Sequence, residues 1–360
     1  DLYPPAALRQ AIRDANALIF SRGQSSIGFQ GMGTTCSCLV LLPQGALVAH
    51  VGDSRVYRLR GHTLAQLTFD HSLVWEMAAA GHMAEEDVPA YIPKNVITRS
   101  LGPHETVNID LEGPFDAAEG DAFLLCSDGL SGQIPDAELG ALLHCLEPEE
   151  AVQTLVDLAN LRGGPDNISV IVARLGGEAA VKKLQSQDLI ETQVGGRSAG
   201  SSGRNRLWLT VGVVALFALA FCLVNAFWTA AVVSAGALVT AVGLLLSGRS
   251  GHGSSCAPTQ SLGGPYGNGP YRETSCAPNQ KVVDSLAEIV AKLRGLPTGL
   301  GYKIDWKPLD DGDNAARAAA ERGDFCTAIR SYSAGFRATM RQLRDQRSTG
   351  ADDSGVHSRT

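Results

Sequence analysis

Short apolar runs separated by turn residues fill the first half of the chain and predict a β-rich region. Residues 36–42 and 46–51 are apolar, and Pro43-Gln44-Gly45 between them is typical of a β-hairpin. Residues 56–59 alternate between apolar and polar side chains, which predicts another strand. Ahead of these runs, one apolar stripe at helical spacing predicts a helix, made of Leu8, Ile12, Ala15 and Ile19.

Two later apolar runs carry an Asp at one end. Residues 123–125 lead into Ser127-Asp128-Gly129, and the turn at residues 163–165 precedes Asp166-Asn167 and an apolar run. A carboxylate at a strand end, beside a Gly that lets the backbone approach closely, suits a hard cation. Alternatively, both Asp residues only cap turns, as Asp commonly does.

Six motifs occur in a fixed order and together resemble one known family. They are GMGTT (31–35), VGDSRVYRLRG (51–61), LTFDHS (67–72), ITRSLG (97–102), LLCSDGL (124–130) and GGPDN (163–167). In this order they resemble the bacterial metal-dependent protein phosphatases, the type 2C Ser/Thr phosphatases. The resemblance covers residues 1 to about 175.

The resemblance implies an α+β fold, a β-sandwich flanked by helices, and a protein Ser/Thr phosphatase. Such enzymes use two Mn²⁺ or Mg²⁺ ions to activate a water that attacks phosphoserine or phosphothreonine. Asp128 and Asp166 match the family's ligands for one of these ions, and Asp53 matches the ligand of a third, weaker ion. The implied substrates are phosphoproteins made by Ser/Thr kinases.

Two departures from the family pattern qualify this interpretation. An Asp-Gly-x-Gly-Gly-His block, whose Asp bridges both metals in the family, is absent from the 360 residues. We therefore expect the sequence to lack the first strands of the fold, and the chain as written to be inactive. Gly132 stands where many bacterial members have another Asp, which makes a third metal site doubtful. The alternative is a catalytically dead scaffold that binds phosphoproteins at a membrane.

Other residues near the motifs favour structural roles. Arg55 is expected to form a local ion pair, and Asp70 and Ser72 to cap a helix that starts near His71. Residues 72–98 correspond to a variable flap of the family, where Trp75 is expected to pack.

Charge and cysteine content exclude some classes of protein. The net charge of −7 offers no basic surface, so nucleic acid is not an expected partner. The eight Cys residues show no C-x₂-C spacing, which favours reduced, buried thiols in a cytosolic protein. If the C-terminal part lies outside the cell instead, Cys256 and Cys276 of the repeated Ser-Cys-Ala-Pro motif are able to pair.

Composition changes sharply after the phosphatase-like domain, residues 1–176. Residues 177–206 form a polar, flexible linker, and residues 207–246 contain no charge. One helix of this length measures about 60 Å, twice the hydrocarbon thickness of a bilayer. A transmembrane helical hairpin that reverses near Asn225 therefore fits better, and Arg204, Arg206 and Arg249 place both flanks in the cytoplasm. The alternative is one tilted span with the tail outside.

The remaining sequence predicts a linker and a helical tail. Residues 247–280 are rich in Gly, Pro and Ser, and residues 281–347 carry two apolar stripes at helical spacing. Residues 318–332 resemble the turn of a tetratricopeptide repeat. A single repeat cannot bury its own apolar face, so we expect this tail to pack on the helix at 281–294, on the phosphatase or on a protein partner.

Overall fold

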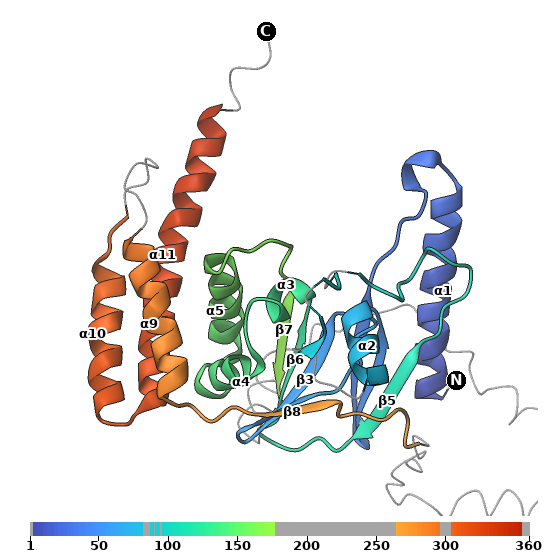
Figure 1. The fold of residues 1–360 in the computed structure, drawn as a ribbon, viewed down its shortest axis with the longest axis horizontal. Helices are drawn as coiled ribbons and strands as arrows, with labels where there is room; N and C mark the ends of the chain where they lie inside the picture. The colour runs from blue at the N-terminus through green and yellow to red at the C-terminus, as the bar shows by residue number, and fades with distance from the viewer. Residues whose placement is uncertain are drawn as a thin grey trace, which may run out of the picture. The chain divides into compact units, whose positions relative to one another are not determined.

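Two antiparallel sheets form the centre of the fold in the computed structural model, which describes residues 3–81, 87–89, 91–93, 96–176, 264–295 and 304–354 (Figure 1). The first sheet has the order β1-β2-β5. Its strands are Cys36–Leu42, Gly45–Val51 and Asp110–Phe115. The second has the order β7-β6-β3-β4-β8. Its strands are Val170–Arg174, Ala122–Cys126, Arg55–Arg60, Thr63–Gln66 and Arg272–Ser275.

The β-hairpin predicted at residues 36–51 is confirmed. Strands β1 and β2 pair from Cys36 opposite Val51 to Leu42 opposite Gly45. Gly45 has a φ of +130°, and a Cβ at this position would come within 2.5 Å of the Phe115 carbonyl oxygen. Only glycine therefore fits where the hairpin turns against β5.

Helices flank the sheets. Helix α1 (Pro4–Gln24), which the apolar stripe predicts, begins with two prolines and packs on β2. Its Ile12 is buried in a cluster that includes Leu47 and Leu111. Helix α2 (Leu73–Gly81) begins after Ser72, whose hydroxyl accepts a hydrogen bond from the Trp75 amide. The short helix α3 (Asp128–Ser131) follows β6, and α4 (Asp136–Cys145) and α5 (Pro148–Leu161) cover the second sheet.

The C-terminal part adds a strand to the second sheet. Strand β8 pairs antiparallel with β4, from Thr63 opposite Ser275 to Gln66 opposite Arg272. These residues lie in the segment 247–280, where the sequence predicts a linker. The strand forms because its backbone satisfies the edge of β4. Its polar side chains leave no apolar alternation in the sequence.

Three helices follow β8: α9 (Gln280–Arg294), α10 (Lys307–Glu321) and α11 (Phe325–Ser354). Figure 1 shows them side by side, next to α4 and α5. One hydrophobic core runs from β3 and β6 through α4 and α5 to the apolar stripes of α9 and α11. Of the expected partners for the helical tail, the structure therefore shows the phosphatase-like part and the helix at 281–294.

A disulfide between Cys145 and Cys326 joins α4 to α11 across 181 positions of sequence. The expectation of reduced thiols throughout is therefore wrong for this pair, because the fold brings together two cysteines that have no short spacing in the sequence. Cys276 is a free, buried thiol, and Cys256 lies outside the described residues. Arg337 adds an ion pair to Glu150, at 2.7 Å, across the same interface.

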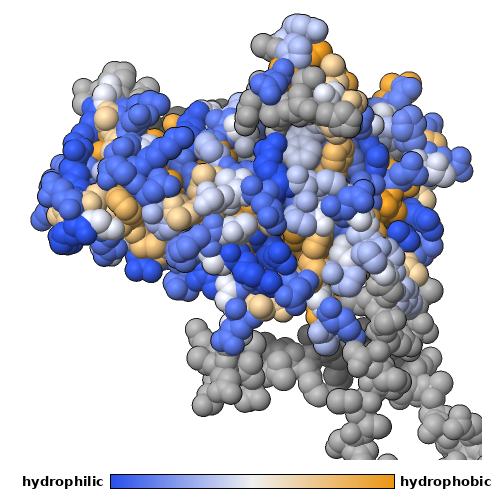
Figure 2. Space-filling model, turned by 60° about the horizontal axis from the view of Figure 1, so that its bottom comes forward, coloured by the Kyte–Doolittle hydropathy of each residue, from blue (hydrophilic) through white to orange (hydrophobic). Residues whose placement is uncertain are grey.

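Within the described ranges, no helix is both long and apolar enough to cross a membrane. The predicted linker at 177–206 and the predicted hairpin at 207–246 lie outside those ranges. Helices α10 and α11 form an antiparallel pair, while the tetratricopeptide-like character of the tail stays a prediction. On the face drawn in Figure 2, apolar residues are scattered among hydrophilic ones.

Candidate active site

The three predicted metal ligands, Asp53, Asp128 and Asp166, line a single cleft of about 1180 Å³. Sheet register explains how they meet. Arg55, the first residue of β3, pairs with Cys126, the last residue of β6, so Asp53 and Asp128 each lie two residues beyond the same end of this strand pair. Strand β7 pairs with β6 on its other side and follows directly after the Asp166 turn. Three neighbouring strands, β7, β6 and β3, thus each bring one carboxylate to the same end of the sheet, where β6 ends and β3 and β7 begin.

The turns that carry Asp128 and Asp166 are fastened to each other. The Ser127 hydroxyl donates to the Asn167 carbonyl oxygen at 3.1 Å and accepts from the Ser169 amide at 2.9 Å. A Cβ on Gly129 would lie 2.4 Å from the Asn167 carbonyl oxygen, so this close approach requires glycine. Each Asp also accepts a hydrogen bond from the next backbone amide, at 2.9 Å for Asp128 and 2.7 Å for Asp166. These bonds are typical of turn-capping Asp, so the capping role and the cleft position coexist.

Asp53 is 8% exposed, and its electrostatic environment is unfavourable for a negative charge. Burial raises the pKa of its carboxyl group, and the charges of Asp128 and Asp166 raise this pKa further. Like charges this close oppose ionisation unless a cation lies between them.

Two buried histidines hold the turn that precedes Asp53. The Gly52 amide donates to Nδ1 of His71 at 2.9 Å, and the Gly52 carbonyl oxygen lies 2.8 Å from Nε2 of His50. Nε2 of His71 lies 2.9 Å from the Asp110 carboxylate. Burial lowers the pKa of His50 to about 4, so His50 is neutral at pH 7. His71 therefore shapes the backbone of the site rather than facing the cleft as a ligand.

The donor set fits a hard divalent cation. Carboxylate oxygens are the ligands that Mg²⁺ and Ca²⁺ prefer, and Mg²⁺ commonly uses only one or two carboxylates and completes its shell with water. Among the residues that the structure describes, no group of three or more His, Cys, Asp or Glu side chains is placed to hold a metal ion. Asp53, Asp128 and Asp166 therefore line one cleft without forming a three-ligand site. Asp128 and Asp166 are exposed to the cleft, where their oxygens are accessible.

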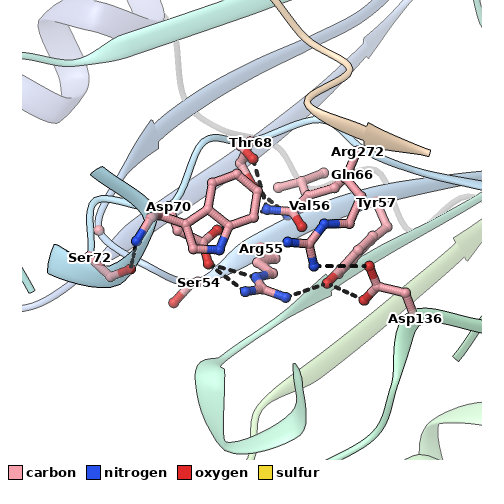
Figure 3. Close-up of polar contacts among 12 residues, drawn as sticks. Ser54, Arg55, Val56, Tyr57, Gln66, Thr68, Asp70, Ser72, Asp136 and Arg272 are labelled. Atoms are coloured by element: carbon pink, nitrogen blue, oxygen red, sulfur yellow. Dashed lines mark hydrogen bonds and ion pairs between the residues drawn. The ribbon is translucent and has the colours of Figure 1, made fainter. Parts of the chain in front are cut away.

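A buried polar chain forms another part of the cleft wall (Figure 3). Nε and Nη2 of Arg55 both contact Oδ2 of Asp70 at 2.7 Å, which confirms the predicted local ion pair. Arg55 also donates to the Tyr57 hydroxyl at 3.1 Å, and that hydroxyl donates to Asp136 at 3.0 Å. Asp70 is therefore a partner of Arg55 and not a helix cap, because the fold places it under the guanidinium. Ser72 alone performs the predicted capping.

Sequence reasoning missed the C-terminal residues of the cleft. Arg272 and Thr274 of β8 line it together with Tyr271, the residue before this strand, although more than a hundred residues separate them from Asp166. The Arg272 guanidinium carbon lies 5.0 Å from the centre of the Trp75 ring, and the Arg55 guanidinium carbon lies 5.5 Å from it. Trp75 thus lines the cleft between two cations. Only a three-dimensional pairing of β8 with β4 reveals this, and no sequence signal predicts it.

Comparison with known proteins matches the first part of the chain to one family. A family model described as "Protein phosphatase 2C" matches residues 5–159. The serine/threonine phosphatase stp of Listeria monocytogenes is 37% identical over 167 residues, which are 46% of this chain and 66% of that protein. Protein phosphatase PhpP of Streptococcus pneumoniae is 39% identical over 166 residues, which are 46% of this chain and 67% of that protein.

A solved structure of the catalytic domain of the serine threonine protein phosphatase PstP, in complex with two manganese ions, is 33% identical. The alignment covers 49% of this chain and 73% of that one, with a TM-score of 0.43. The chain spans 66% of the length of the Listeria relative. The chain belongs to the protein phosphatase 2C family, as the six sequence motifs indicate.

Proposed function

We propose that this protein is a metal-dependent protein phosphatase that hydrolyses phosphoserine and phosphothreonine. Its substrates are phosphoproteins made by Ser/Thr kinases. The observation that carries the proposal is that Asp53, Asp128 and Asp166 line one cleft, in a chain that belongs to the protein phosphatase 2C family. We propose that Asp128 and Asp166 bind Mn²⁺ or Mg²⁺, with Asp53 beside them as a weaker ligand.

The residues around Asp128 and Asp166 support hydrolysis without a covalent enzyme intermediate. Bound divalent ions would lower the pKa of a water and offset negative charge on the phosphoryl oxygens. The thiol nearest to Asp128 in sequence is Cys126, and burial raises its pKa to about 12, which keeps it protonated and unreactive at pH 7. The tied turns at Ser127 and Asn167 hold the two exposed carboxylates in place.

The test is turnover of p-nitrophenyl phosphate and of a phosphothreonine peptide by the product of the whole coding sequence, with Mn²⁺ and with chelator. We expect Mn²⁺-dependent turnover, lost in Asp128→Asn and in Asp166→Asn and reduced less in Asp53→Asn. Asp116→Asn, an exposed carboxylate outside the cleft, is the matched control. Full activity in Asp128→Asn and Asp166→Asn would reject the site.

The second candidate is a phosphatase fold that binds phosphoproteins without hydrolysing them. It is favoured by the finding that, within the described part of the chain, no three His, Cys, Asp or Glu side chains are placed to hold a metal ion together. Calorimetric titration with Mn²⁺ separates the two functions. Binding of a phosphopeptide without Mn²⁺ binding and without turnover would establish the scaffold.

We also propose that residues 207–246 tether the protein to a membrane as a helical hairpin, with both flanks in the cytoplasm. Support comes from forty consecutive residues without charge and from the flanking Arg204, Arg206 and Arg249. In this arrangement the cleft faces the compartment in which kinases use ATP. The helical tail remains a candidate surface for a protein partner.

A further inference from the structure

The C-terminal segment supplies a wall of the catalytic cleft. Tyr271 is fixed at three points: its amide donates to the Gln66 carbonyl oxygen at 2.9 Å, its hydroxyl donates to Glu112 at 2.6 Å, and its ring meets the Phe69 ring edge-on at 5.4 Å. The next residue, Arg272, is paired with Gln66 in the β4–β8 ladder. Backbone and side-chain contacts therefore hold this wall in one position.

Arg272 and Arg55 are the cationic residues among the described residues that line the cleft. They differ in accessibility. Arg55 is buried against Asp70, whereas the Arg272 side chain is 34% exposed. Nη1 of Arg272 forms an ion pair with the Asp136 carboxylate at 3.8 Å, and the arginine side chain is still partly open to solvent. An anionic group that enters the cleft from solvent therefore meets Arg272 before Arg55.

The cleft is larger than a phosphorylated side chain requires. Its volume of about 1180 Å³ exceeds that of pockets that enclose a drug-sized molecule, roughly 300–1,000 Å³. The cleft therefore has room for residues on either side of the phosphorylated one. A guanidinium presents its donors as a planar fork that matches a carboxylate with two parallel hydrogen bonds.

We propose that Arg272 selects substrates that carry an Asp or Glu beside the phosphorylated residue. The inference rests on the proposed phosphatase function and names its substrate class, an acidic phosphopeptide. The phosphoryl group would bind to the divalent ions that Asp128 and Asp166 are proposed to hold, and the neighbouring carboxylate would bind to Arg272. Because the match to the protein phosphatase 2C family model ends at residue 159, this preference is a property of the C-terminal segment and not of the matched region.

The test combines two peptides with two proteins. One phosphothreonine peptide has Glu beside the phosphorylated residue and the other has Gln. For the full-length protein we expect the change from Glu to Gln to raise KM roughly threefold to tenfold with kcat unchanged, the range expected of a partly exposed ion pair with two hydrogen bonds. In Arg272→Gln the two peptides should have equal KM values. Arg341→Gln, an exposed arginine on α11, is the matched control and should keep the wild-type preference.

Charge reversal provides a second variant. Arg272→Glu should prefer a peptide with Lys beside the phosphorylated residue, and Arg272→Lys, which keeps the charge but not the fork, should show a smaller preference for Glu. An equal loss of affinity for both peptides in Arg272→Gln would overturn the proposal, as would a preference of the wild type for the Lys peptide. Thermal melting of each variant identifies unfolding. If Arg272→Gln unfolds, the preference of Arg272→Lys for the Glu peptide over the Gln peptide decides whether the proposal holds.

Binding of fluorescein-labelled peptides, measured by polarisation, separates this inference from the phosphatase function. If no peptide is hydrolysed, the proposed function fails. The Glu peptide must still bind more tightly than the Gln peptide, and Arg272→Gln must still remove that difference. If the wild type hydrolyses both peptides with equal KM and equal affinity, the role of Arg272 is rejected and the phosphatase function stands.

Discussion

Two aspartates that line the cleft, Asp70 and Asp53, have opposite electrostatic environments. Asp70 lies under a guanidinium that neutralises it, whereas Asp53 faces two further carboxylates. The same residue type is therefore stabilising at one position and destabilising at the other. The sequence motifs singled out Asp53, Asp128 and Asp166, which line the cleft, and their role as metal ligands stays a prediction. Helix-capping rules assigned Asp70 the wrong role, because its partner Arg55 precedes it by 15 positions and meets it only through the pairing of β3 with β4.

Asp53→Asn should stabilise the protein when no divalent cation is present. Burial and the charges of Asp128 and Asp166 raise the pKa of Asp53 in the folded state. Ionised Asp53 therefore costs stability, which declines as the pH rises from the ordinary pKa of 3.8 through the raised folded value. We expect a higher melting temperature than wild type at pH 7 in chelator, and no gain below the ordinary pKa. Added Mn²⁺ should stabilise the wild type more than the variant, and a variant that melts earlier in chelator would contradict the electrostatic account.

Asp70→Asn should be strongly destabilising. The substitution leaves the buried Arg55 charge without its carboxylate, which typically costs about 3–5 kcal/mol. Asp116→Asn is the matched control, because the pair of Asp116 with Arg60 is exposed at both side chains and such pairs contribute less than about 1 kcal/mol. Urea unfolding of the two variants measures the difference, and equal unfolding free energies would show that the Arg55 charge is relieved in another way.

At the scale of elements, helices with a strong apolar periodicity could be predicted from the sequence, whereas a strand made of polar residues could not. The stripe at 282–293 predicted α9, and its six apolar residues are buried. Strand β8 has no such signal, because all four of its side chains are polar. Its neighbourhood is visible only in three dimensions. A Cβ on Gly140 of α4 would lie 2.4 Å from Cβ of Cys276, so glycine in mid-helix admits the end of β8.

The Cys145–Cys326 disulfide should stabilise the attachment of α11 to α4. Closing a long loop lowers the entropy of the unfolded chain, and such bonds typically contribute about 2–4 kcal/mol. The double variant Cys145→Ser, Cys326→Ser should unfold at lower urea concentration than the wild type and should no longer respond to dithiothreitol. Cys276→Ser, which removes a free buried thiol, should keep the response to dithiothreitol. Mass spectrometry of alkylated protein identifies the thiols, and free Cys145 and Cys326 in protein isolated without reductant would refute the bond.

At the scale of the whole molecule, the family, the two sheets and the carboxylate edge of the cleft could be predicted from ordered motifs. The division of the chain could not be read in the same way. Composition separates residues 1–176 from 281–347, yet one hydrophobic core includes Leu124 and Leu142 as well as Leu286 and Phe336. A change in composition marks the boundary between two segments of the sequence. It does not reveal whether the two segments pack into one hydrophobic core in the folded protein.

Residues 201 and 254 should lie on the same side of the membrane. Single cysteines introduced as Ser201→Cys and Ser254→Cys, in a background without native cysteines, should resist an impermeant thiol reagent until the cells are broken. Asn225→Cys, at the proposed reversal, should be labelled in intact cells and serves as the control. Labelling of Ser254→Cys alone in intact cells would establish a single span with the tail outside.

The order of the second sheet has a consequence for this topology. Val170–Arg174 and Arg272–Ser275 are strands of the same sheet, so the chain between them leaves one folded body and returns to it. A path that starts and finishes on one side of a boundary crosses it an even number of times. If residues 207–246 enter a bilayer, a single crossing would place β7 and β8 on opposite sides of it. Such a placement is incompatible with one sheet that contains both strands. If this segment does enter a bilayer, the hydrogen bonds of the second sheet require an even number of crossings.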